Sequence, residues 1–96
     1  MTAYILFTLE SISDPDAWQR YRQAARPSLG QYGGRILAGP EVIELLEGEP
    51  LSDAVIVAFD DVAAAQAWYR SPEYQSALPI RQSGTTGRAL ILAGRD

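Results

Sequence analysis

The segment from Ala54 to Phe59 reads AVIVAF and carries no polar side chain. Successive side chains of a β-strand point to opposite faces of the sheet. Val55, Val57 and Phe59 would therefore face one way, and the three residues between Ala54 and Ala58 the other. A strand that is apolar on both sides is expected where both faces of its sheet are covered. This requirement constrains the fold more than any other feature of the chain.

Two further segments have the same character. Residues 3–9 (AYILFTL) and 88–94 (RALILAG) are predicted strands that are apolar on both sides. Residues 35–48 (RILAGPEVIELLEG) predict two short strands, or one strand bent at Gly39-Pro40, because proline cannot donate to a sheet ladder. We expect Gly84 and Gly87 to mark a turn before the last strand.

Helix signals separate these strands. Asp14 is a predicted N-cap followed by a proline, and Pro27 is expected to end or kink this helix near Arg26. The segment DDVAAAQAWYR, residues 60–70, predicts a second helix with an aspartate cap. The residue before a proline avoids helical geometry, so Ser71 should end that helix and cap a new one.

The order of elements is therefore β-α-β-β-α-β, which predicts one α+β domain, residues 1–96, with a ferredoxin-like sheet and helices on one face. Helices on one face leave the other apolar face uncovered, and a 96-residue chain has no spare segment for it. We expect a second copy to cover it, sheet against sheet, giving a homodimer built as a dimeric α/β barrel. The alternative is a monomer with an exposed apolar sheet, which would tend to aggregate.

Composition excludes several classes of chemistry. The chain lacks Cys, His and Lys, so disulfides, a His-based triad, a Schiff-base lysine and the usual zinc and haem ligands are ruled out. We expect no metal and no cofactor, and any proton transfer must fall to Asp, Glu, Tyr, water or the substrate. The net charge of −4 makes nucleic acid an unsuitable partner, and no apolar run is long enough for a membrane helix. These features predict a cytoplasmic protein.

Four motifs carry a family resemblance: YGGRIL, LLEGE, AWYRSPEYQ and PIRQ occur in this order and spacing. Together they resemble the family of domains of unknown function numbered 1330. The resemblance covers nearly the whole chain and implies the dimeric α/β barrel superfamily, which includes cofactor-free oxygenases, dehydratases and lactone isomerases. Oxygenase members often place a His or Asn in the pocket, and this chain has neither.

The segment AWYRSPEYQ, residues 67–75, holds three of the candidate binding residues. Trp68 and Tyr69 are adjacent on a helix, about 100° apart, so they cannot both face the same core. Trp68, Tyr69 and Tyr74 have two possible roles: simple packing between helix and sheet, or an aromatic wall for a bound ligand. Ser71 has no His or Lys to activate it, so we interpret it as a helix cap.

Three more residues complete the candidate site. Tyr32 precedes a Gly-Gly pair and could face the same space. Arg81 could bind a ligand carboxylate, although pairing with Glu47 or Glu73 is the simpler interpretation. Glu47, at the predicted end of an apolar strand, could act as a base if it were partly buried.

These observations favour a homodimer that binds a small organic molecule between helices and sheet, walled by the four aromatic residues and anchored by Arg81 or Glu47. Two alternatives remain open. One is a cofactor-free monooxygenase or isomerase acting on a phenolic or lactone-like substrate. The other is a structural dimer without a ligand. The sequence does not decide whether the protein is an enzyme.

Overall fold

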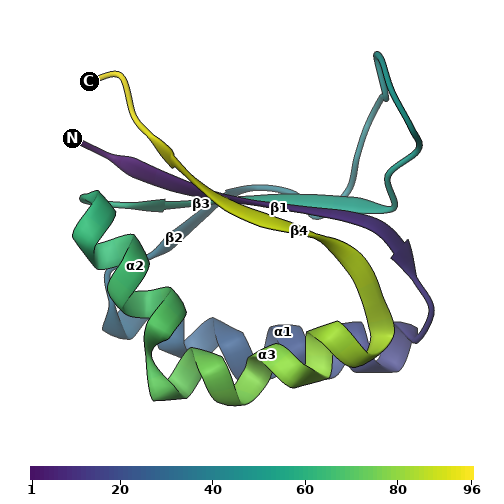
Figure 1. The fold of residues 1–96 in the computed structure, drawn as a ribbon, viewed down its shortest axis with the longest axis horizontal. Coiled ribbons are helices and arrows are strands. Elements are labelled where there is room, and N and C mark those ends of the chain that lie inside the picture. Colours follow the sequence, from purple (N-terminus) through teal and green to yellow (C-terminus); the bar gives the residue numbers. More distant parts are fainter.

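A computed structural model describes residues 1–96 as one antiparallel sheet with a layer of helices on one face (Figure 1). The fold is α+β and ferredoxin-like, with strand order β2-β3-β1-β4, as the sequence predicts. No helix covers the opposite face, toward which the loop after β2 and both chain ends extend. The elements are β1 (Ala3–Ile12), α1 (Pro15–Gln31), β2 (Arg35–Ala38), β3 (Asp53–Phe59), α2 (Val62–Arg70), α3 (Pro72–Gly84) and β4 (Thr85–Ala93).

Strand β1 lies at the centre and pairs antiparallel with both β3 and β4. Ile5 stands opposite Val57 on one side and Ile91 on the other. Facing residues share one side of the sheet, so these three side chains belong to the face under the helices. A slip of one residue would move every apolar side chain to the other face, which fixes the register.

Helix α1 differs from the sequence prediction, because it continues through Pro27 to Gln31. Asp14 caps its start as expected, accepting hydrogen bonds from the backbone N–H groups of Asp16 and Ala17. Its buried face runs from Trp18 past the proline to Leu29. Packing of this continuous face offsets the hydrogen bond that a proline removes. Of the two expected outcomes, a helix end near residue 26 was wrong, and a kink there stays a prediction.

Ser71 joins two helices, as predicted. Its hydroxyl donates to the carbonyl oxygen of Trp68 (2.7 Å) and accepts from the backbone N–H of Tyr74 (3.1 Å). Pro72 then occupies the first position of α3, where its missing N–H costs nothing. One side chain therefore closes α2 and opens α3.

The predicted turn between Gly84 and Gly87 does not form, because α3 leads directly into β4 at Thr85. Gly84 serves a different purpose at the crossing of α3 with α1. A Cβ atom built on it would come within 2.7 Å of the Cβ of Ala17. The glycine therefore allows α3 to approach α1 closely. The sequence alone does not distinguish a glycine needed for such a contact from a glycine in a turn.

The segment after β2 forms less strand than the sequence suggests. Gly39 has a φ of +98°, which favours glycine, and the Gly39-Pro40 bond is cis. Glu41 then makes one isolated bridge to Asp53, and no second strand follows. The apolar residues of the loop, residues 42–52, lie largely in solvent, with Ile43 at 85% exposure.

The two faces of the sheet differ in burial. On the helix face, large side chains such as Ile5, Leu9 and Phe59 are at most 1% exposed. On the opposite face, called the open face below, Leu6 and Ile56 are half-buried and Leu92 is 46% exposed. The sequence prediction that both faces are apolar is confirmed, and this chain covers only one of them. None of the three helices combines the length and apolarity needed to cross a bilayer.

Candidate functional site

A cavity of about 100 Å³ lies between α1 and the part of the sheet formed by β1, β2 and β3. Its floor comes from the sheet, where Phe7, Val55 and Val57 point toward the helices. Residues of α1, including Ala25 and Leu29, form the opposite wall. Predominantly apolar walls with a few polar groups are typical of sites for small organic molecules.

Two tryptophans contribute to this wall while their polar atoms are bonded elsewhere. The indole N–H of Trp18 donates to the carboxylate of Asp53 (3.0 Å), and that of Trp68 donates to the hydroxyl of Ser28 (2.8 Å). Buried indole N–H groups require such partners. With both satisfied within the chain, the two rings present apolar surface to the cavity.

Two arginines give the cavity its charge. Arg22 and Arg26 lie four residues apart on α1, so they occupy the same side of the helix. The Arg22 guanidinium lies 5.4 Å from the centre of the Trp18 ring and donates to the side-chain oxygen of Gln19 (2.6 Å). Its Nε is buried and has no hydrogen-bond partner. A polar or negatively charged group on a bound molecule would therefore find donors here.

Gly39 and Pro40 form the end of the cavity beside β2. A Cβ atom on Gly39 would collide with the backbone of Ala54 and Val55. The Pro40 carbonyl oxygen accepts a hydrogen bond from Ala54 N–H (3.0 Å). Glycine at position 39 thus lets the chain close this end while staying bonded to β3.

Of the residues selected from the sequence, Trp68 lines the cavity. Tyr74 packs behind it, with ring centres 4.1 Å apart, and Tyr69 packs on Tyr74 at 5.2 Å. Trp68 and Tyr74 are 1% and 0% exposed, so both rings belong to the hydrophobic core. Tyr69 is half-buried and lies outside the cavity lining.

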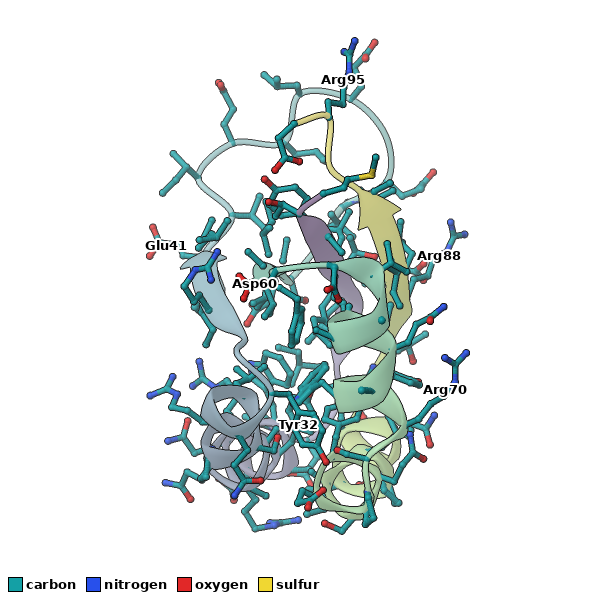
Figure 2. All side chains as sticks on the ribbon, turned by 90° about the vertical axis from the view of Figure 1, so that its left-hand side faces the viewer. Tyr32, Glu41, Asp60, Arg70, Arg88 and Arg95 are labelled. Atoms are coloured by element: carbon teal, nitrogen blue, oxygen red, sulfur yellow. The ribbon has the colours of Figure 1, made fainter.

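Two other candidates lie apart from this cavity. The Tyr32 hydroxyl donates to the carboxylate of Glu73 (3.2 Å), linking the end of α1 to the start of α3; Figure 2 shows Tyr32 between these helices. Glu47 belongs to no strand and is exposed in the loop after β2. The binding roles of both residues remain predictions, and the structure brings neither of them to the cavity.

Arg81 is 5% exposed and pairs with neither Glu47 nor Glu73, contrary to the simpler interpretation of the sequence. Arg35 and Asp60 make the one ion pair of the structure. The Arg81 guanidinium instead lies over the rings of Phe7 and Tyr21, 5.4 and 5.6 Å from their centres. Both rings also line the cavity, so Arg81 stands behind its wall.

The hydroxyl groups of Tyr21 and Tyr74 lie 3.0 Å apart in the core. Burial is the main cause that raises the pKa of Tyr21, and the neighbouring Tyr74 raises it further. Burial also raises the pKa of Tyr74, against the opposing effects of its bond to Tyr21 and of the Arg81 charge. Both phenols therefore stay protonated at neutral pH and can donate or accept hydrogen bonds.

No cluster of three acidic side chains is arranged to hold a metal ion. The sequence did not single out Arg22 or Arg26 as site residues, although both follow Trp18 at helical spacing. Trp18 and Tyr21 lie three residues apart, a spacing typical of the buried face of a helix, and they also line the cavity. Periodicity finds the buried face of a helix, but it does not show where packing against the sheet is incomplete.

The sequence from residue 2 to residue 95 matches the model of a domain of unknown function, DUF1330. The chain belongs to this family. The resemblance seen in the four sequence motifs is thereby confirmed. No curated protein sequence matches the chain.

Solved structures share the fold of this DUF1330 protein. A protein of unknown function from Rhodopseudomonas palustris is similar, with a TM-score of 0.79, 21% identity, and coverage of 99% of this chain and 83% of that one. A dimeric ferredoxin-like protein of unknown function from a Jannaschia species has a TM-score of 0.69 and 19% identity, covering 98% and 100%. SnoaB, a cofactor-independent oxygenase from Streptomyces nogalater, has a TM-score of 0.65 and 10% identity, covering 99% and 93%. At these identities the likeness concerns the fold.

Proposed function

We propose that this DUF1330 protein binds a small, largely apolar organic molecule in the cavity between α1 and the sheet. The cavity itself carries the proposal, because it combines apolar walls with the arginines Arg22 and Arg26. A cavity of about 150 Å³ is enough for benzene. At about 100 Å³ this cavity is smaller, so a bound ring would fill it and extend past its opening toward the exposed Arg26.

We also propose that the protein functions as a homodimer in which two open faces pack together. The open face presents the half-buried Leu6 and Ile56 and the more exposed Leu90, and no helix of the chain covers them. Exposed apolar sheet is unfavourable in a soluble monomer. The dimeric description of the Jannaschia protein supports this assembly.

Binding can be measured by fluorine NMR with 4-fluorophenol, a ring-sized probe. We expect its signal to broaden or shift on adding the wild-type protein, and to stay unchanged with Val55→Phe, which fills the cavity from β3. Ile80→Phe adds a ring on α3 outside the cavity and should retain binding. Equal binding by both variants, or none by the wild type, would contradict the proposal.

A cofactor-free oxygenase or isomerase acting on a phenolic substrate is the second candidate, supported by the fold shared with SnoaB. Catalysis without His would have to rely on phenols or carboxylates, and the two buried phenols are poor bases at neutral pH. Oxygen uptake with a panel of hydroquinones separates an oxygenase from a protein that only binds. A protein that only binds consumes no oxygen, whereas an oxygenase consumes it in proportion to enzyme.

A further inference from the structure

A second hollow opens near the opposite edge of the sheet, between α3 and the edge strand β4. It measures about 420 Å³ and is lined mainly by polar residues. The Phe7 and Tyr21 rings separate Arg81, which lines this hollow, from the apolar cavity. The hollow is thus distinct from the cavity of the proposed function.

Arg81 is the unusual feature of this hollow. Its side chain is buried to 95%, since its relative exposure is 5%, and no carboxylate lies within 4.0 Å of it. Its Nε is buried and donates no hydrogen bond. Buried charges are normally paired, because an unpaired ion loses its hydration without compensation. The rings of Phe7 and Tyr21 attract the cation, and the Tyr21 and Tyr74 hydroxyls lie within its reach, but these groups are neutral and leave the charge without an anionic partner.

The remaining lining suits a negatively charged group. Gln82 and Thr86 add side-chain donors, and no Asp or Glu lines the hollow. The Thr85 hydroxyl donates to the Arg81 carbonyl oxygen (2.7 Å), which holds the end of α3 against the start of β4. As an edge strand, β4 also leaves alternate backbone N–H groups without partners in the sheet.

Arg88 lies beside the hollow without lining it. It alternates along β4 with Gly87 and Ala89, which do line the hollow, so its side chain projects from the open face. Figure 2 shows Arg88 on the side of the molecule on which α2 and β4 lie.

We infer that the hollow between α3 and β4 is an oxyanion-binding site in which Arg81 is the main ligand. The bound group is a carboxylate or a phosphate carried by a small molecule, since both offer the paired oxygens that a guanidinium binds. Arg81 reaches the ligand from within the core, and Gln82 and Thr86 complete the donors from its rim.

The test follows the side-chain Nε–H signal of Arg81 by nitrogen-15 NMR while sodium phosphate or sodium acetate is added, against sodium chloride at equal ionic strength. We expect saturable shifts of this signal with phosphate or acetate and none with chloride. The anion that binds more tightly, phosphate or acetate, distinguishes a phosphate site from a carboxylate site. A signal that responds identically to all three salts would overturn the inference.

Arg81→Met removes the proposed anion ligand. Arg88→Met is its control, because it removes an exposed arginine from the same side of the molecule. Thermal unfolding with and without phosphate should show at least a tenfold weaker apparent affinity for Arg81→Met and less than a twofold change for Arg88→Met. Without anion, Arg81→Met should melt no lower than the wild type, because the unpaired charge is gone. A lower melting temperature with unchanged phosphate stabilisation would assign Arg81 to packing alone.

Discussion

The two faces of the sheet are both apolar, yet only one of them is covered by helices of the chain. The helix face carries the Phe7 and Phe59 rings, which pack edge-on or tilted against Trp68. The open face carries Tyr4, Leu6 and Ile56, which stay half-buried. The rings of the helix face pack against helices of the same chain, whereas no helix covers the side chains of the open face. The chain therefore stabilises one face of its sheet with its own helices and leaves the other face accessible to a second molecule.

Trp68→Ala tests whether the helix face supplies most of the stability, and we expect it to have the largest effect. Trp68 contacts rings from both β1 and β3 and is 1% exposed, so its loss should lower the free energy of unfolding by about 3–5 kcal/mol. Urea unfolding followed by circular dichroism measures the change. Trp68→Phe retains a ring and should lose clearly less. A loss below about 1 kcal/mol would mean that the helix face is not where stability resides.

High pH should weaken the helix face specifically. Burial raises the pKa of Tyr21 and Tyr74 in the folded protein, while tyrosines of the unfolded chain titrate near pH 10. The folded state therefore keeps its phenolic protons longer, and the stability present below about pH 10 falls as the pH rises further. Two such groups can reduce it by up to about 2.7 kcal/mol per pH unit.

Urea unfolding at several pH values between 8 and 11 measures this slope. Tyr21→Phe removes one of the two phenols and should reduce the slope by about half the contribution of the pair. The hydrogen bond between the two hydroxyls is lost as well, so the variant is compared with itself across pH. Equal slopes in the variant and the wild type would contradict the assignment.

Ile56→Glu tests the open face. It places a charge opposite Leu6 at the centre of the face, where the proposed dimer would bury it twice. We expect association to weaken at least tenfold, with the mass measured by analytical ultracentrifugation falling from dimer to monomer. Ala63→Glu adds the same charge on an exposed position of α2 and should leave the mass unchanged. A wild-type monomer at low micromolar concentration would refute the dimer itself.

Ser71→Ala should have the smallest effect, about 1 kcal/mol of lost stability. The substitution removes the bond to Tyr74 N–H and the bond to the Trp68 carbonyl oxygen. Thermal unfolding measures the loss, and Ser71→Thr, which keeps a hydroxyl, should recover most of it. Full stability in the alanine variant would show that Pro72 and packing alone set the joint between α2 and α3.

The sequence predicted the order of elements, the Ser71 joint and the two apolar faces because each depends on local or periodic signals. It did not predict that the helix continues past Pro27, where Trp18 and Leu29 belong to one buried face. It failed again at Gly84, since close contact with Ala17 is a tertiary property.

The candidate site was harder to predict. Trp68 was predicted as a candidate because its ring is large and amphipathic; it lines the cavity, and its binding role stays a prediction. Arg22 and Arg26 were missed because a cavity arises from imperfect packing between elements far apart in sequence. Arg81 was selected, but its lack of a carboxylate partner emerges only from the packed structure.

The bonds between the two ends of the described chain have a consequence for connectivity. Asp96 accepts hydrogen bonds from the Thr2 hydroxyl (2.8 Å) and backbone N–H (3.1 Å), while Gly94 N–H donates to the Thr2 carbonyl oxygen (2.6 Å). A short linker could therefore join residues 96 and 2, with new ends opened in the exposed loop of residues 42–52. Such a permuted protein would begin with β3 and end with β2, with the same strand neighbours reached by a different path along the chain.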